Sequence, residues 1–144
     1  MHDVDDHAST DRNVARFLTG PPRIAPVFDD LDPSQGGGVF RRIDGDAVLL
    51  TWCDVPEFDA GSNRVNVQVR LAADGSIDFV YGTTVSPAAA VVGLSPGETG
   101  IFTPIDVSAA VSATIAGGTG AVGERFANTR DLDFVALTKK FYQT

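Results

Sequence analysis

The strongest constraint on the fold is the stretch RVNVQVRL, residues 64–71, in which apolar and polar residues alternate strictly. Successive side chains of a β-strand point to opposite faces, so Val65, Val67 and Val69 would share one face and the polar residues between them the other. A helix would mix the two kinds around its circumference. The pattern therefore predicts a strand in a sheet with one buried face and one wet face.

Turn signals predict that this strand belongs to antiparallel hairpins. An Asp-Gly pair at 74–75 follows it and leads into a second alternating run, residues 77–82. Another Asp-Gly pair, at 44–45, precedes the apolar run 48–55, which Pro56 is expected to end. Asp-Gly favours the tight turn of a hairpin because both central residues of the preferred turn need positive φ.

The remaining elements are shorter. A helix is expected just before Gly20 and the two prolines that follow it, since proline cannot continue a helix. Residues 88–94 and 137–144 are further strand candidates, whereas the stretch 95–123 gives no clear signal. Short strands, tight hairpins and no long amphipathic helix predict an all-β fold, an antiparallel β-sandwich of jelly-roll-like type with a short N-terminal helix.

The chain is expected to form one β-sandwich domain over residues 13–144, preceded by a disordered acidic leader, residues 1–12. The net charge of −8 and the presence of only two lysines argue against nucleic-acid binding. No run of about 18 apolar residues is present, so membrane insertion is not expected. The single cysteine, Cys53, excludes an intramolecular disulfide. The leader is unlike a signal peptide, so an export signal would have to lie outside this chain.

Four segments, in this order, resemble the nidogen-like β-sandwich domain of bacterial secreted and cell-surface proteins. They are GPPRIAPVFDDLDPSQGGGVF (20–40), VLLTWCDVPEF (48–58), NVQVRLAADGSIDFVYG (66–82) and VVGLSPG (91–97). The sequence departs from the family pattern after Pro26, where Val27 replaces an aromatic residue and Phe28 follows it. The resemblance implies an extracellular, non-enzymatic domain for display or adhesion, with no catalytic residues to carry over.

Three aspartates between residues 29 and 32 are the candidate metal site within the expected fold. Asp29, Asp30 and Asp32 precede three consecutive glycines and could offer oxygen ligands to calcium, the one cofactor considered. The spacing is not that of an EF-hand, because Arg41 stands where a bidentate Glu is required. The alternative is that these side chains bond nearby backbone amides and form a turn. The sequence favours the turn and keeps calcium as the second interpretation.

Catalytic alternatives have weaker support. Asp54, Glu57 and Asp59 could supply the two carboxylates of a glycoside hydrolase, but any acidic loop offers such pairs. The only two histidines lie in the leader, where they cannot be held beside a nucleophile. The glycine-rich segment 117–123 has the spacing of a dinucleotide-binding loop, but the residues after it are too few for the helix and strand that such a site needs. The sequence therefore predicts that the protein is not an enzyme.

The expected function is adhesion, display or assembly within a secreted or cell-surface protein. The partner would be a protein or glycan surface, or a second copy of the chain. An exposed sheet edge offers unpaired backbone donors and acceptors for such contacts. Two alternatives stay open: a carbohydrate-binding module that stacks sugars on exposed aromatic residues, and a self-assembling fibre or filament subunit that uses edge-strand complementation.

Overall fold

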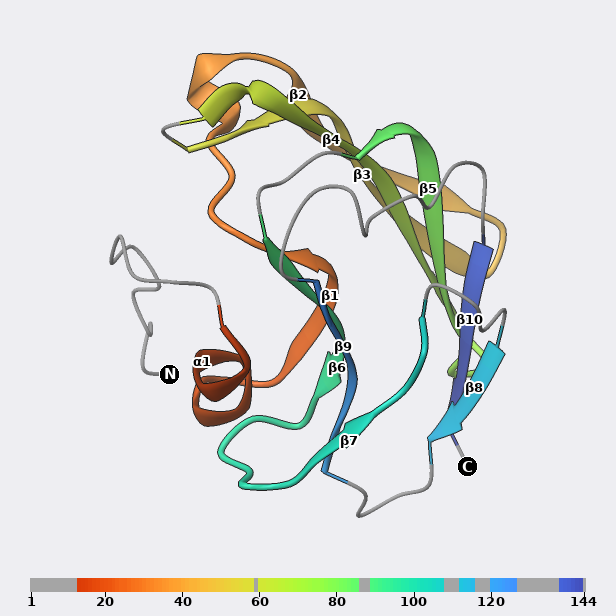
Figure 1. The fold of residues 1–144 in the computed structure, drawn as a ribbon. Helices are drawn as coiled ribbons and strands as arrows, with labels where there is room; N and C mark the ends of the chain where they lie inside the picture. Colours follow the sequence, from red (N-terminus) through yellow and green to blue (C-terminus); the bar gives the residue numbers. More distant parts are fainter. Residues whose placement is uncertain are drawn as a thin grey trace.

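A computed structural model describes residues 13–58, 60–85, 89–107, 112–115, 120–126 and 138–143 (Figure 1). The expected leader, residues 1–12, lies outside these ranges. The elements are α1 (Val14–Thr19), β1 (Arg23–Phe28), η1 (Pro33–Gln35), β2 (Gly38–Asp44), β3 (Ala47–Glu57), β4 (Ala60–Ala72), β5 (Ile77–Val85), β6 (Ala90–Ser95), β7 (Phe102–Pro104), β8 (Ser112–Ile115), β9 (Ala121–Phe126) and β10 (Thr138–Gln143).

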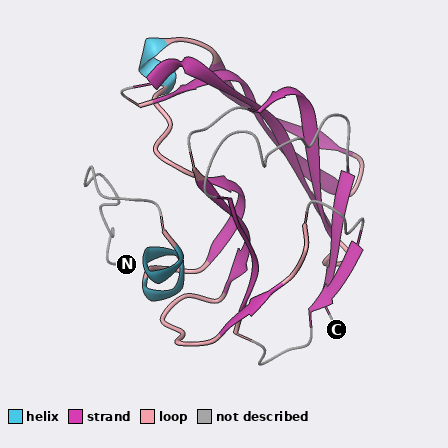
Figure 2. Ribbon diagram, viewed as in Figure 1, coloured by secondary structure: helices cyan, strands magenta, loops and turns pink. Residues whose placement is uncertain are grey.

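The described strands form two sheets that face each other, as a sandwich does (Figure 2). One sheet has four strands in the order β1-β6-β9-β7, and the other has six in the order β2-β3-β4-β5-β10-β8. Most neighbours are antiparallel, but β7 pairs with β9, and β8 with β10, in parallel. The all-β sandwich with a short N-terminal helix is confirmed.

Strand β4 has the predicted alternation. Val65, Val67 and Val69 are buried in the core between the sheets, whereas Asn66 and Gln68 lie half-buried on the opposite face. Gln68 donates a hydrogen bond of 2.8 Å to the Thr51 hydroxyl on the neighbouring strand β3. At β4 one face of the six-stranded sheet is therefore apolar and the other polar, as the sequence predicts.

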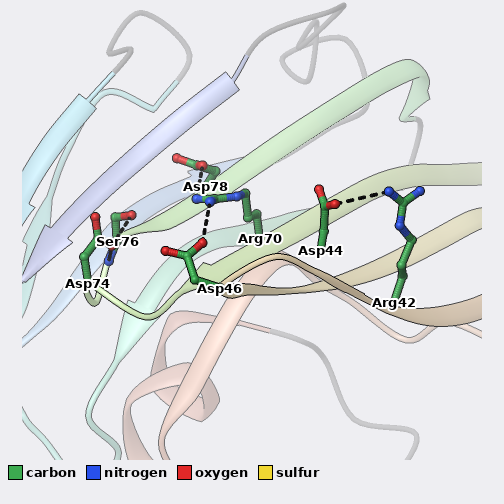
Figure 3. Close-up of polar contacts among 7 residues, drawn as sticks. All are labelled: Arg42, Asp44, Asp46, Arg70, Asp74, Ser76 and Asp78. Carbon is green, nitrogen blue, oxygen red and sulfur yellow. Dashed lines mark hydrogen bonds and ion pairs between the residues drawn. The ribbon is translucent and has the colours of Figure 1, made fainter.

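The hairpin between β4 and β5 turns at the second Asp-Gly pair. Gly75 has a φ of 85°, and the Asp74 carboxylate accepts hydrogen bonds from the Ser76 amide and hydroxyl at 2.9 and 2.7 Å (Figure 3). These hydrogen bonds, the backbone one foremost, hold the pKa of Asp74 below its ordinary value. Glycine is required at the left-handed position and aspartate fixes the turn before it, which confirms this hairpin.

The first hairpin forms one residue later than the sequence predicts. The central residues of its turn are Gly45 and Asp46, because Asp44 already pairs with Ala47. Of the two central residues only Gly45 has positive φ, at 61°. Glycine at the first central position is typical of a type II′ turn, which does not need the Asp-Gly pair at its centre. The hairpin is thus confirmed and the turn residues are corrected.

Strand β3 also differs from the prediction, since it continues through Pro56 to Glu57. The register with β4 is irregular on both sides of Pro56, and Asp54 has a φ of 54°. Proline cannot donate to a ladder, but a bulge removes the need for that donor. The bulged strand end therefore accommodates Pro56, whose side chain is buried.

Helix α1 covers the outer face of the four-stranded sheet (Figure 1). Its N-cap, Asn13, accepts a hydrogen bond of 3.0 Å from the Arg16 amide. The Phe17 ring is fully buried and lies 5.6 Å from the Phe28 ring of β1, measured between centroids. The Arg23 guanidinium lies 4.9 Å from the centroid of the Phe28 ring and donates to the carbonyl of Arg16 in α1. These contacts fix β1 from outside.

A buried hydrogen bond connects β1 to the opposite sheet. The Tyr81 hydroxyl of β5 donates to the Pro26 carbonyl of β1 at 2.8 Å. Burial raises the pKa of Tyr81 well above its ordinary value, so the phenol remains protonated and stays a donor. This bond positions the edge strand β1 over the core.

We predict that Tyr81→Phe destabilises the fold by about 1–2 kcal/mol, because the Pro26 carbonyl then stays buried without a partner. Thermal and urea unfolding should both show the loss, with the unfolding midpoint lowered by about 4–8 °C. A change within experimental error would mean that the bond does not join the sheets.

Candidate functional site: the open side of the sandwich

The six-stranded sheet is wider than the four-stranded sheet that faces it, and the excess is exposed at β2. Cross-strand register places Val39 opposite Trp52, which is in turn opposite the core residue Val67. Ile43 lies on the same face, because directly opposed residues of neighbouring strands share a face. Val39 is nevertheless 49% exposed and Ile43 67% exposed. The described residues therefore leave the core-facing side of β2 uncovered.

A groove lies next to this exposed face. It has a volume of about 750 Å³ and is lined by residues 22–32 together with Trp52 and Phe58. Ile24 of β1 is 44% exposed although it pairs with Leu94, which packs against the core. Phe58 is 45% exposed. We use the name open side for two neighbouring features together: the groove residues Ile24, Trp52 and Phe58, and the exposed core-facing residues of β2, Val39 and Ile43.

The predicted aspartates lie at one end of the groove, where they form the turn that follows β1. The Asp32 carboxylate caps the short helix η1 and accepts a hydrogen bond of 3.0 Å from the Ser34 amide. Asp29 accepts one of 2.8 Å from the Asp30 amide. Gly37 completes the corner with a φ of 66°, and a Cβ there would lie 2.3 Å from the Asp54 carbonyl oxygen. This is the turn chemistry that the sequence favours.

No group of three or more Cys, His, Asp or Glu side chains in the described ranges is arranged to hold a metal ion. Asp29, Asp30 and Asp32 line the same groove, and the carboxylates of Asp29 and Asp32 each accept a hydrogen bond from a backbone amide of the turn. Calcium binding by the three aspartates stays a prediction.

Sequence reasoning missed a carboxyl pair formed by Asp29 and Glu57. Burial raises the pKa of Asp29 to about 7, and the charge of Glu57 and a hydrogen bond between the two carboxyl groups contribute to the rise. Asp29 Oδ2 is buried and has no hydrogen-bond partner among the described residues, so the pair is favoured when one of the two carboxyl groups carries a proton, as the raised pKa of Asp29 implies below about pH 7. Asn63 donates to Glu57 Oε2 at 2.6 Å and holds that side chain in place.

Backbone contacts hold the two halves of this pair together. The Asp32 amide donates to the Pro56 carbonyl at 2.9 Å, and the Phe58 amide donates to the Asp30 carbonyl at 2.8 Å. The turn after β1 is thus joined to the end of β3. No local signal reveals this pairing, because the two carboxyls are far apart in the sequence.

The carboxyl pair does not have the arrangement of a glycosidase. The two carboxyl groups of such enzymes stand about 5–9.5 Å apart, on either side of the bond to be cleaved. Asp29 and Glu57 instead share a hydrogen bond, and Asp29 Oδ2 has no surface that a ligand could reach. Asp54 lies apart, with its amide donating to Asn66 at 2.9 Å, and Asp59 is outside the described residues.

Comparisons with known proteins identify no family for this chain. A scan against protein-family models found no match, and neither did searches of curated proteins and of solved structures. The nidogen-like resemblance thus stays a prediction. Among the described residues, no helix is long and apolar enough to cross a membrane.

We predict that Asp29→Asn alters the pH dependence of stability. The pKa of Asp29 is raised from 3.8 to about 7 on folding, so the folded state binds this proton more tightly than the unfolded state does. The resulting contribution to the free energy of unfolding is fully present below pH 3.8. That stabilisation is lost as the pH rises through 7. At pH 8 the variant should be more stable than the wild type by about 2 kcal/mol, after allowance for solvent screening. At pH 4 the difference should be small.

Urea unfolding between pH 4 and 8 measures this difference, with Asp44→Asn, an exposed carboxyl on β2, as the control. Parallel stability profiles for the wild type and Asp29→Asn would contradict the shared-proton pair.

Proposed function

We propose that this protein is a non-catalytic binding domain that attaches an extended segment of another polypeptide at its open side. Its role would be adhesion, display or assembly. One observation carries the proposal: core-facing apolar side chains of both sheets, Ile24 from one and Val39 and Ile43 from the other, are exposed beside strand edges. Burying them would remove apolar surface from water at about 25 cal/mol per Å².

An extended chain fits this surface better than a globular partner does. The exposed residues follow two strands, and the groove runs along the whole of β1 and into the turn after it. Edge-strand recognition combines main-chain hydrogen bonds with pockets for alternate side chains. The open side offers both.

The extracellular setting rests on the resemblance to nidogen-like domains, whose segments 20–40 and 66–82 contribute β1 and the β4–β5 hairpin here. In that setting the domain would be one module of a secreted or cell-surface protein. The excess of carboxylates over cations, a net charge of −8, keeps such a surface soluble and repels nucleic acid.

Selection from a displayed library of 12-residue peptides tests the proposal. The wild type should retain peptides with apolar residues that can face Val39 and Ile43. Ile43→Lys should lose them, because it puts a second cation beside Arg41 where the peptide offers an apolar residue, and an unmatched inward charge opposes pairing. Phe40→Lys is the matched control: Phe40 lies on the same strand, is 60% exposed and faces the opposite side. Selected peptides should bind this control as they bind the wild type.

Three results would contradict the proposal: no enrichment of peptides by the wild type, selected peptides that bind Ile43→Lys as well as the wild type, or an equal loss of binding in Ile43→Lys and Phe40→Lys. A dimer that dissociates only in Ile43→Lys would show that a second copy occupies the open side, as in a fibre subunit.

A carbohydrate-binding module is the second candidate, because Trp52 and Phe58 line the groove together with Asp29, Asp30 and Asp32. Aromatic rings stack on sugars and carboxylates accept from sugar hydroxyls, and the carboxylates that could do so here are Asp30 and Asp32, because Asp29 Oδ2 is buried. Phe58→Ala should then abolish binding on a glycan array. An array with no signal for the wild type would remove this candidate.

A further inference from the structure

The turn between β2 and β3 determines which backbone groups of β2 point outward. Asp44 and Ala47 close the turn as a hydrogen-bonded pair. Opposed residues of an antiparallel pair alternate between hydrogen-bonded and non-hydrogen-bonded. Phe40 and Arg42 therefore bond inward to β3, whereas the amides and carbonyls of Val39, Arg41 and Ile43 point to the open edge.

The other edge on the open side is less suited to pairing. Strand β1 contains Pro26, which has no amide to donate, and its ladder with β6 is irregular between Ala25 and Phe28. The Pro26 carbonyl already accepts from Tyr81. Prolines and bulges are devices that protect sheet edges. Strand β2 has neither, and its seven residues pair regularly with β3. Its one inward-pointing charge, Arg41, would oppose an added strand unless that strand supplies an opposite charge.

The side chains of β2 show what a pairing strand must offer. Arg41 is exposed, lies between Val39 and Ile43 on the core-facing side, and has no ion pair within the described residues. The arginines on the other face of this sheet are paired: Arg42 with Asp44 at 3.3 Å, and Arg70 with Asp46 and Asp78 at 3.6 Å each (Figure 3). Arg41 is thus a cation between two exposed apolar side chains.

We propose that β2 receives an added antiparallel strand with a specific pattern: an acidic residue opposite Arg41, and apolar residues two positions away on each side. The acidic residue would pair with Arg41, and the apolar residues would pack beside Val39 and Ile43. Opposite charges and apolar pairs directly across neighbouring strands are both stabilising. This inference rests on the proposed function and adds the sequence class of the partner.

Two synthetic peptides test it: acetyl-Thr-Val-Thr-Glu-Thr-Val-Thr-amide and the same peptide with Lys in place of Glu. Titration into the full chain, followed by NMR shifts of the Val39, Arg41 and Ile43 amides, gives the two affinities. The Glu peptide should bind about fivefold tighter, the size expected of one cross-strand ion pair. In Arg41→Glu the preference should reverse.

Arg42→Glu is the matched control, because it makes the same charge change one residue away on the opposite face. It should keep the wild-type preference. Equal affinities for the two peptides, or a reversal in both variants, would overturn the acidic pattern while the library selection could still support the proposed function. Binding of neither peptide, or shifts confined to other strands, would overturn strand addition at β2. A free protein that is dimeric and unresponsive to the peptides would assign the edge to a second copy.

Discussion

The two sheets differ in the number of their strands, and the exposed face of β2 follows from this difference. Four strands cannot cover six, so part of the apolar face of the larger sheet must meet something other than the smaller sheet. At β4 and β5 the apolar face of the larger sheet is fully covered, and Val65, Phe79 and Tyr81 are buried. At β2 the described residues do not cover this face. The same alternation that buries Val67 and Val69 therefore leaves Val39 and Ile43 exposed.

Residues 22–32 form one wall of the groove that lies beside the uncovered part of the larger sheet. Its strand β1 is held from outside by Phe17 and Arg23 and from inside by the Tyr81 hydroxyl. Its turn is held by backbone hydrogen bonds to the end of β3 and, below about pH 7, by a proton on the Asp29–Glu57 pair. The groove wall is thus fixed on three sides, which favours a preformed surface over one that forms on binding. Preformed surfaces lose less conformational entropy when they bind.

The sequence predicts the local features of this fold and misses those that depend on distant partners. The alternation from Val65 to Val69 and the left-handed Gly75 are set by neighbouring residues, so both were predictable. The first turn shifts by one residue because the ladder from Asp44 to Ala47 decides which two residues remain unpaired. The pairing of Asp29 with Glu57 and the parallel neighbours β7 and β9 depend on contacts between distant segments, which one sequence does not reveal. The sequence predicts that Asp29 and Asp32 form a turn, because their partners are neighbouring backbone amides. The exposed core-facing side of β2 depends on the strand order, which the sequence does not reveal.

Amide hydrogen exchange along β2 in the isolated protein tests the central claim most directly. We expect exchange rates to alternate along β2: rapid at Val39, Arg41 and Ile43, whose amides point to the open edge, and slow at Phe40 and Arg42, which bond to β3. Uniformly slow exchange at all five residues would contradict it, because the edge would then already be covered.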